Sequence, residues 1–285
     1  MYDLHTHSHH SDGELSPSDL VAAASMAGVQ FLALTDHDTV SGIAEAQRAA
    51  QDLSMRIIPG VEISTRWHKH DIHVVGLNID PTHPILLAGL ELQGELRRER
   101  VLKIAEALTK AGCKDVLETV RAHSGTDDVV TRAHFAQYLL VNGYVTTFQG
   151  AFKKYLGRGK PAYVATDWVS IATAIEWIRA AGGVAVLAHP ARYELTSTKI
   201  RELVAHFKAS GGQALEVVTS VHSPNDVTNL TKLTKQFELH ASMGSDYHGS
   251  RMVHARLGGL APMPGGCTPV WRLWEDVPLS MEMRL

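Results

Sequence analysis

The stretch that predicts the fold runs from residue 31 to residue 38 and reads Phe31-Leu32-Ala33-Leu34-Thr35-Asp36-His37-Asp38. Its four apolar residues have the length and composition of a buried strand, and the polar residues that follow begin a loop. An imidazole between two carboxylates, directly after a strand, indicates a site in which one carboxylate orients the ring. The stretch therefore predicts a buried strand that delivers polar groups to one edge of a sheet.

Strand and helix patterns alternate around this stretch. Ser16 is the expected N-cap of a helix over about 17–27, because proline follows it and Gly28 ends the pattern. The chain continues with a helix over 42–53 and strands over 56–59 and 72–77. Later helices are expected over 168–181, 198–209 and 225–237, and strands over 183–188, 214–218 and 238–243. This order predicts an α/β fold with a parallel sheet or barrel and helices outside.

Residues 84–156 interrupt the alternation with helix after helix and a charged face. We therefore expect a helical insertion subdomain over 91–156 and a barrel built from 1–90 and 157–285. The last 25 residues contain four prolines and two glycines, and we expect them to form a tail that wraps the barrel.

Length and composition narrow the class of protein. A chain of 285 residues with 45% hydrophobic residues is long enough for one large domain, or for one domain with an insertion. The net charge of −3 provides no global attraction to nucleic acid, so we expect no binding of long duplexes. The two cysteines lie far apart and exclude a disulfide scaffold and a thiolate zinc site.

The sequence also predicts where the protein resides. Its first residues lack the basic start and apolar run of a signal peptide, so we expect nothing to be removed. Its apolar runs are far shorter than the roughly 20 residues that cross a bilayer. We expect a soluble cytoplasmic protein without a membrane partner.

Histidine is the unusual feature of the composition, with seventeen residues that gather in clusters. Potential ligands follow almost every expected strand, at the edge where parallel α/β folds assemble their sites. They are His5, His7, Asp36, His37, Asp38, Glu62, His73, His189, Glu216, Asp246 and His248. Histidine beside carboxylate at so many strand ends indicates a metal centre.

Individual positions differ in how much they indicate. His5 and His7 alternate on extended chain and therefore point to one side, where both can bind one cation. Glu62 follows a strand whose apolar residues predict burial, and a cation is its expected partner because an unpaired buried carboxylate is costly. Asp12 in a Ser-Asp-Gly turn is ordinary turn chemistry by itself. His68 and His70 lie in a polar loop, and we expect both to be solvated.

Taken together, these residues resemble the PHP (polymerase and histidinol phosphatase) family. The resemblance spans almost the whole chain in order, except the helical insertion, through the motifs His5-Thr6-His7, Ser11-Asp12-Gly13, Thr35-Asp36-His37, Gly60-Val61-Glu62, His73, His189-Pro190, Glu216 and Asp246-x-His248. It implies a distorted seven-stranded (β/α) barrel related to the amidohydrolases, with two or three divalent metal ions.

The resemblance also implies a set of ligands. The first metal would be held by His5, His7, Glu62 and Asp246, the second by Glu62, His73 and His189, and the third by Asp12, His37 and His248. Glu62 would bridge the first two, and Glu216 would support the ligands from behind. Such ligands accept Mn, Fe or Zn, of which we expect Mn.

The implied chemistry is hydrolysis of phosphate esters, with metals that activate water and clamp the phosphoryl group. Asp246 and His37 are the candidate catalytic residues, and Asp246 or a water at the third metal would protonate the leaving oxygen. Candidate substrate-binding residues lie in the insertion and after it, at Arg132, His134, Arg158, Lys160 and His222. A basic segment over 153–160 suits a second phosphate on the substrate.

Within the family, the chain most resembles the branch that removes the 3′-phosphate from nucleoside 3′,5′-bisphosphates. We therefore expect a phosphoric monoester hydrolase for a small phosphorylated nucleotide, such as adenosine 3′,5′-bisphosphate. Three alternatives stay open. They are a 5′→3′ exonuclease on short RNA, a histidinol-phosphate phosphatase, and a barrel in which metals only stabilise a structural or partner-binding module.

Overall fold

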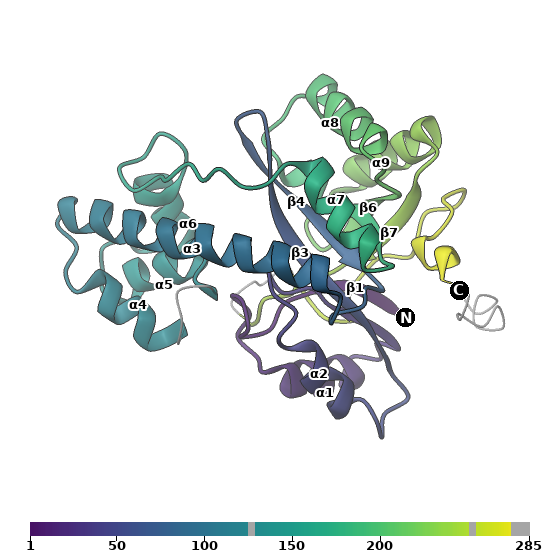
Figure 1. The fold of residues 1–285 in the computed structure, drawn as a ribbon, viewed down its shortest axis with the longest axis horizontal. Coiled ribbons are helices and arrows are strands. Elements are labelled where there is room, and N and C mark those ends of the chain that lie inside the picture. Colours follow the sequence, from purple (N-terminus) through teal and green to yellow (C-terminus); the bar gives the residue numbers. More distant parts are fainter. Residues whose placement is uncertain (125–128, 251–254, 275–285) are drawn as a thin grey trace. The chain divides into compact units, whose positions relative to one another are not determined.

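The computed structural model describes residues 1–124, 129–250 and 255–274. A seven-stranded sheet forms its centre, with the strands in sequence order from β1 to β7. The strands are β1 (Tyr2–Thr6), β2 (Phe31–Leu34), β3 (Arg56–Trp67), β4 (His70–Leu77), β5 (Val184–Leu187), β6 (Ala214–Thr219) and β7 (His240–Gly244). Thr6 also pairs with Tyr247 just after β7, so the sheet curls into a nearly closed barrel (Figure 1). The expected distorted seven-stranded barrel is confirmed.

The prediction of an all-parallel sheet is wrong at β4. This strand runs antiparallel to both β3 and β5, whereas the remaining neighbours pair in parallel. Only His68 and Lys69 separate β3 from β4, and so short a connection permits a hairpin but no crossover. The barrel is therefore mixed.

The length of β3 differs from the expected strand over 56–59. The strand continues to Trp67, through polar residues that the sequence pattern assigned to a loop. Glu62, Ser64 and Thr65 are all buried in this continuation, although their side chains are polar. Glu62 consequently lies inside a strand instead of following one, with its side chain held in the middle of the molecule.

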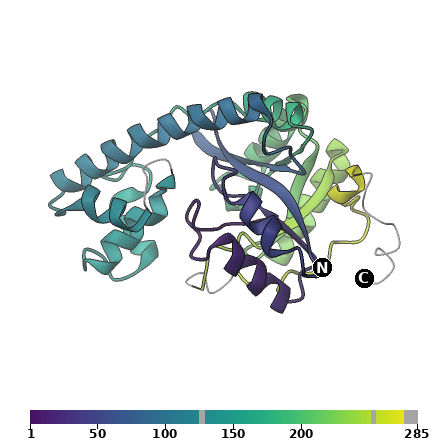
Figure 2. The same ribbon diagram turned by 60° about the horizontal axis from the view of Figure 1, so that its bottom comes forward.

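Helices cover the outside of the barrel. Helix α1 (Pro17–Met26) begins at the expected cap, since the Ser16 side chain accepts a hydrogen bond from the amide of Asp19. Leu20 of α1 and Ala46 of α2 (Ile43–Ala49) share one apolar cluster with Leu32 of β2, and the two helices lie side by side in both views (Figures 1 and 2). This cluster fixes the strands that carry the first polar loops.

The later helices pack in the same way. They are α7 (Ile171–Ala180), α8 (Ser197–Ala209) and α9 (Pro224–Phe237). Gly76 of β4 leaves room for Ile178 of α7, because a Cβ atom at this glycine would lie 2.9 Å from Ile178 Cγ1. Among the residues with described positions, no helix has the length and apolar character needed to cross a membrane.

The chain divides into two compact units, one of Met1–Gly89 and Val169–Leu285 and the other of Leu90–Trp168. Helix α3 (Pro84–Lys110) leads from the first into the second, which also contains α4 (Val116–Ser124), α5 (Arg132–Val141), α6 (Phe148–Ala151) and a π-helical turn, η2 (Phe152–Leu156). Its own core includes Leu108, Phe135, Leu139 and Leu156. Residues 90–124 and 129–168 contain no strand.

The described part of the expected tail packs on the barrel. Its short helix η4 (Val270–Leu273) brings Trp271 against Tyr2, with ring centroids 3.9 Å apart, and Tyr2 stacks on Phe31 at 4.3 Å. Residues 275–285 of the expected tail lie outside the described residues.

Candidate active site

The first and last strands bring two histidines and a carboxylate together. His5 lies on β1 and His7 follows it on extended chain, so the two rings point the same way. The amide of His7 donates to the Tyr247 carbonyl at 2.9 Å, and the amide of Asp246 donates to the His5 carbonyl at 2.9 Å. Closure of the barrel therefore places Asp246 beside both histidines.

Backbone pairing beyond the end of β2 places His37 beside Glu62. The Glu62 amide donates to the Asp36 carbonyl at 3.2 Å, and the Asp38 amide donates to the Glu62 carbonyl at 2.9 Å. His73 comes from the neighbouring strand β4, where it lies opposite Ser64. Glu62 is thus flanked by one imidazole from each side of its strand.

Three non-glycine residues around these side chains have left-handed backbone. The φ angles are 52° at Asp38, 27° at His189 and 55° at Asp246. Such angles are strained for residues with a Cβ atom and persist only where the surrounding structure imposes them. Their occurrence at three separate strand ends indicates that the loops are bent to aim side chains inward.

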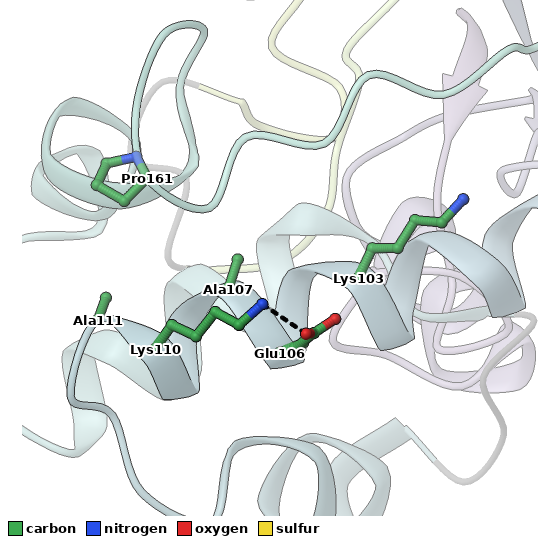
Figure 3. Close-up of a pocket in the computed structure, with 6 residues that line it drawn as sticks. All are labelled: Lys103, Glu106, Ala107, Lys110, Ala111 and Pro161. Carbon is green, nitrogen blue, oxygen red and sulfur yellow. Dashed lines mark hydrogen bonds and ion pairs between the residues drawn. The ribbon is translucent and has the colours of Figure 1, made fainter.

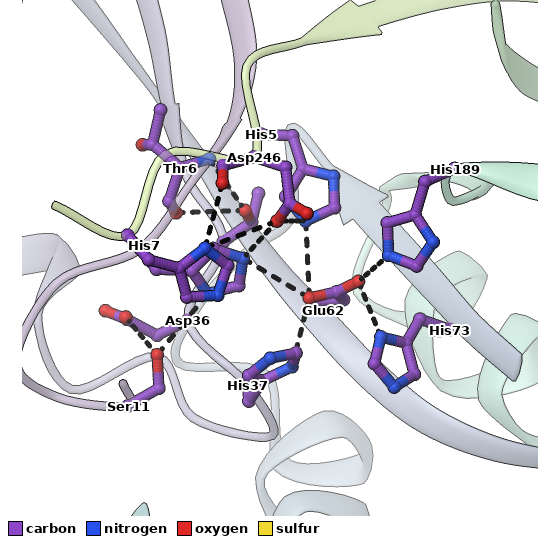
Figure 4. A network of polar contacts seen from close by, with 12 residues as sticks. His5, Thr6, His7, Ser11, Asp36, His37, Glu62, His73, His189 and Asp246 are labelled. Atoms are coloured by element: carbon purple, nitrogen blue, oxygen red, sulfur yellow. Dashed lines mark hydrogen bonds and ion pairs between the residues drawn. The ribbon is translucent and has the colours of Figure 1, made fainter. Parts of the chain in front are cut away.

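Glu62 is the centre of the arrangement (Figure 4). Its side chain is fully buried, and its Oε1 lies 2.9 Å from His73 Nδ1 and 3.0 Å from His189 Nε2. Its Oε2 lies 3.2, 3.3 and 3.0 Å from ring nitrogens of His5, His7 and His37. Five imidazoles from four segments of the chain therefore surround one carboxylate.

The side chains fall into three groups whose ligand atoms lie within 4.8 Å of one another, and each group could hold a metal ion. The groups are His5, His7, Glu62 and Asp246; His37, Glu62 and His73; and His7, Asp12, His37 and His248. The structure thus gathers all nine residues expected as ligands, with His189 joined to Glu62 Oε1. His7 and His37 each belong to two groups, a sharing that the sequence did not indicate.

The donor atoms suit divalent cations. His5 Nε2, His7 Nε2, His37 Nδ1 and Glu62 Oε2 are buried, and no hydrogen bond of ordinary geometry satisfies them. Each buried polar atom left in this way costs about 1–3 kcal/mol, which a coordinated cation would remove. Imidazole nitrogen with carboxylate oxygen is the ligand set of Zn, Mn and Fe sites. The residues present therefore fit the divalent metal ions that the sequence led us to expect.

The charges of the side chains themselves point the same way. Burial acts to lower the pKa of His7, but the nearby carboxylates of Asp246 and Glu62 raise it to about 10. Burial acts to raise the pKa of Glu62, but the charges of His5 and neighbouring imidazoles hold it well below its usual range. Protons on histidine thus balance the carboxylates, and a metal ion would take their place.

Glu216 supports two of these histidines from behind. Its Oε1 lies 3.0 Å from His5 Nδ1, and its Oε2 accepts the backbone amide of His189 at 2.6 Å. The carboxylate therefore sets the ring orientation of His5 and the position of the loop that carries His189. Partners of this kind fix the tautomer of a ligand and raise its basicity.

The position of Asp36 beside His37 in the sequence had indicated that it orients the ring of His37. In the structure Asp36 instead binds the loop after β1. Its carboxylate accepts hydrogen bonds from the hydroxyls of Ser8 and Ser11, each at 2.6 Å. Ser11 Oγ in turn lies 3.4 Å from His7 Nδ1. Asp36 therefore orients His7 through Ser11.

Four of the candidate substrate-binding residues belong to the helical unit. Arg132 is half-buried, while Arg158 and Lys160 are exposed. His134 has a local structural role, since its Nδ1 accepts the backbone amide of Thr131 in a capping box at the start of α5.

His222 lies in the barrel unit, in the loop after β6. Its Nδ1 donates to the Val217 carbonyl at 2.9 Å, which leaves Nε2 as an acceptor. This Nε2 is buried and accepts no hydrogen bond within the described structure. The ring is therefore fixed in one tautomer.

Two residues at the cluster were not found by sequence reasoning. Arg192 forms an ion pair with Asp246, and the Tyr193 hydroxyl accepts the backbone amide of His73 at 2.8 Å. Neither arginine nor tyrosine is a usual metal ligand, although both residues lie within four positions of His189. A search for any polar residue in each strand-end loop would have found them.

A separate groove in the helical unit has a volume of about 500 Å³ (Figure 3). It is lined by Lys103, Glu106, Ala107, Lys110, Ala111 and Pro161. Its only carboxylate pairs with Lys110 at 2.6 Å, and Lys103 pairs with Glu99. This lining contains no histidine and offers none of the constellation seen at Glu62.

Comparisons with known proteins agree with this site. The chain is 47% identical over 270 residues to a 5′-3′ exoribonuclease of Haemophilus influenzae, covering 95% of this chain and 97% of that protein. It is 39% identical to a 3′,5′-nucleoside bisphosphate phosphatase of Chromobacterium violaceum, covering 96% of both chains. Both relatives are named for the hydrolysis of phosphate esters.

Solved structures share the fold. An amidohydrolase from Chromobacterium violaceum, solved with bound sulfate and no metal, superposes with a TM-score of 0.91 at 39% identity and covers 95% of this chain and 94% of that one. A Bifidobacterium adolescentis protein assigned as a metal-dependent phosphoesterase gives a TM-score of 0.81 at 25% identity, covering 94% and 92%.

A family model closes the comparison. The model for the PHP domain matches residues 3–220, which include seven of the nine candidate ligands, from His5 to His189. Asp246 and His248 lie beyond the matched range. The relatives and the buried histidine and carboxylate clusters agree with this match. The chain belongs to the PHP domain family and is a phosphoesterase of that family.

Proposed function

We propose that the protein is a metal-dependent phosphatase that removes the 3′-phosphate from nucleoside 3′,5′-bisphosphates. Adenosine 3′,5′-bisphosphate would yield AMP and inorganic phosphate. The observation that carries this proposal is the position of Glu62, whose two oxygens face different groups of histidines. A carboxylate so placed suits a site in which neighbouring cations act on one phosphoryl group.

The residues of the chain would divide the work as follows. Bound divalent cations would activate water and neutralise charge on the phosphoryl oxygens. Glu62 would contribute one oxygen to each of the two groups of histidines that face it. Glu216 holds His5 and the loop of His189 in place. We keep His37 and Asp246 as the candidate catalytic residues. Burial lowers the pKa of His37 to about 4, so its ring is neutral and able to bind a cation at neutral pH.

A second phosphate on the substrate would give the cations of the helical unit a ligand. We propose that Arg132, Arg158 and Lys160 bind it, together with the imidazoles of His134 and His222. Arginine and lysine side chains form charge-assisted hydrogen bonds with phosphate. The similarity to a 3′,5′-nucleoside bisphosphate phosphatase over 96% of both chains supports a substrate of this class.

A second candidate function is 5′→3′ hydrolysis of short RNA, favoured by the 47% identity to a 5′-3′ exoribonuclease. The two reactions are chemically close. In a nucleoside 3′,5′-bisphosphate the bond that breaks joins phosphorus to the 3′-oxygen of a 5′-phosphorylated nucleotide. Release of the first nucleotide from a 5′-phosphorylated RNA breaks the same bond, with the next nucleotide attached to phosphorus. One site could therefore perform both.

The test is an assay of the protein loaded in turn with Mn, Fe and Zn. The substrates are adenosine 3′,5′-bisphosphate, 5′-AMP, histidinol phosphate and a 5′-phosphorylated trinucleotide, with products separated. We expect AMP and phosphate from the bisphosphate and no turnover of 5′-AMP. A higher kcat/KM on the trinucleotide would favour the second function. Preferred turnover of histidinol phosphate, or none with any metal, would overturn the proposal and leave a structural barrel.

A further inference from the structure

Arg192 is a cation at the edge of a candidate cation-binding site. Its Nη1 donates a hydrogen bond to Oδ2 of Asp246, whose side chain is buried. The other oxygen of that carboxylate, Oδ1, lies 3.5 Å from His5 Nε2 and 3.3 Å from His7 Nε2. Asp246 therefore faces the candidate ligands with one oxygen and Arg192 with the other.

The position of Arg192 is set by a rigid turn. The residue ends the 3₁₀ turn η3 (Pro190–Arg192), whose first carbonyl, that of His189, accepts the Arg192 amide at 2.9 Å. The His189 amide is itself bound by Glu216. Because β5 and β6 both hold this turn, the guanidinium is placed by the sheet and not by a free surface loop.

The ion pair uses only part of the guanidinium. Arginine carries five N–H donors, and the contact with Asp246 occupies one nitrogen. The side chain is 41% exposed, and within the described residues its one hydrogen-bonding partner is Asp246. Donors therefore remain for a ligand that approaches from solvent.

A structural ion pair alone explains this placement poorly. A fixed positive charge next to bound divalent cations repels them and weakens their binding, by Coulomb's law. That cost disappears when an anion lies between the cations and the arginine, because each then attracts it. The chemistry of the pair therefore calls for an oxyanion at this place.

We propose that Arg192 binds a non-bridging phosphoryl oxygen of the substrate, in concert with the metal cluster. This proposal rests on the proposed function in one respect, because it takes the phosphoryl group of the substrate as the oxyanion that Arg192 binds. Arg192 then holds the dianionic end of a monoester in place and keeps the Asp246 oxygen that it binds turned away from the metal ligands.

The experiment measures binding of inorganic phosphate to the metal-loaded full-length protein by calorimetry, with metal content determined separately. Arg192→Ala should retain the wild-type metal content and weaken phosphate binding about 10- to 100-fold. This is the change in affinity expected when one hydrogen bond to a charged group is lost. Arg192→Lys, which keeps the charge but not the fork, should recover part of the loss. Arg201→Ala, on the exposed face of α8, is the matched control and should bind phosphate like the wild type.

Kinetics add a second measurement where turnover is seen. Arg192→Ala should raise KM for the monoester more than it lowers kcat, and should affect a phosphodiester less, since a diester has one non-bridging oxygen fewer. Unchanged phosphate affinity would overturn the proposal. So would a loss of metal from Arg192→Ala, which would make Arg192 a residue that only positions Asp246. If Arg192→Ala does not fold, the same comparison is made with Arg192→Lys.

Phosphate binding needs no turnover, so the two proposals fail separately. A protein that hydrolyses none of the substrates but binds phosphate through Arg192 would overturn the proposed function and support this inference. A protein that hydrolyses the bisphosphate with unchanged phosphate affinity in the Arg192 variants would do the reverse.

Discussion

Two His-x-His pairs of the chain, His5 with His7 and His68 with His70, lie in opposite surroundings. His5 and His7 are fully buried against Glu62 and Asp246. His68 and His70 lie at the turn of the β3–β4 hairpin, where His68 is exposed and both rings lie near Trp67, with centroids 4.7 and 6.3 Å away. The same local pattern thus forms part of a candidate metal site in one place and a surface turn in the other.

The difference lies in what the rest of the fold brings to each pair. Strand β1 pairs with β2, and its end pairs with the chain just after β7. The loops that follow β2 and β7 both carry carboxylates. The hairpin turn is farther along the same ribbon, and its nearest carboxylate, Asp71, pairs with Arg66 at 2.9 Å. A histidine pair therefore becomes a ligand pair only where the sheet supplies oxygen donors.

The largest expected effect comes from removing each pair in turn. The double variant His5→Ala, His7→Ala should lose its bound metal, and its kcat/KM should fall by at least about 10³-fold. Losses of this size follow when residues that act as one catalytic unit are removed. The double variant His68→Ala, His70→Ala should stay within about twofold of the wild type, as surface changes do. Metal analysis and steady-state kinetics measure both. Equal losses in the two variants would contradict the distinction.

Glu216→Gln should have a smaller effect, because the residue touches the ligands and not the metal. The amide keeps the size of the side chain but loses the charge that orients His5 and raises its basicity. Loss of such a partner lowers metal affinity or activity by about 10- to 100-fold. Equilibrium dialysis against metal buffers measures the change. Glu202→Gln on α8 is a control with an exposed carboxylate, and an identical response in both variants would exclude a positioning role.

Removing the metal should lower thermal stability. Ligands that bind only the folded state stabilise it by about 2.7 kcal/mol at a hundredfold excess over the dissociation constant, which corresponds to roughly 5–10 °C at this chain length. Addition of a chelator should therefore lower the Tm of the wild type by several degrees. The His5→Ala, His7→Ala variant should show no such shift, and a shift of equal size there would place the bound metal elsewhere.

Ser11→Ala should have the smallest effect. It interrupts the path from Asp36 to His7, whose Nδ1 lies 3.4 Å from the Ser11 hydroxyl, but leaves every candidate ligand in place. A loss of about 2- to 10-fold in metal affinity is expected for one neutral hydrogen bond. The same dialysis measures it, with Ser210→Ala at the end of α8 as control. A loss as large as that of the double histidine variant would mean that Ser11 is itself a ligand.

Local patterns predicted most of the fold. The cap at Ser16, the helices α1, α7, α8 and α9 and the short apolar strands are where the sequence placed them, because each is specified by residues close together in the chain. The continuation of β3 was missed at Glu62 to Thr65. Its polar side chains break the apolar pattern of a buried strand, and they are satisfied by groups from distant segments.

The candidate site shows the same division. The rule that ligands follow strands found every histidine and carboxylate now gathered around Glu62, and Asp12 with them. It missed Arg192, which binds no metal and gains its meaning only through the ion pair with Asp246, 54 residues away in the chain. Its position is decided by the turn after His189.

The sequence by itself determined the residue types of the site, the edge of the sheet where they gather and the family to which the chain belongs, since short motifs carry all three. Only the tertiary structure decided that β3 and β4 form a hairpin, that Glu62 is shared by five histidines, and that Asp246 lies beside His5 and His7. These features depend on pairings between residues far apart in the chain. Closure of the barrel between Thr6 and Tyr247 creates the last of them.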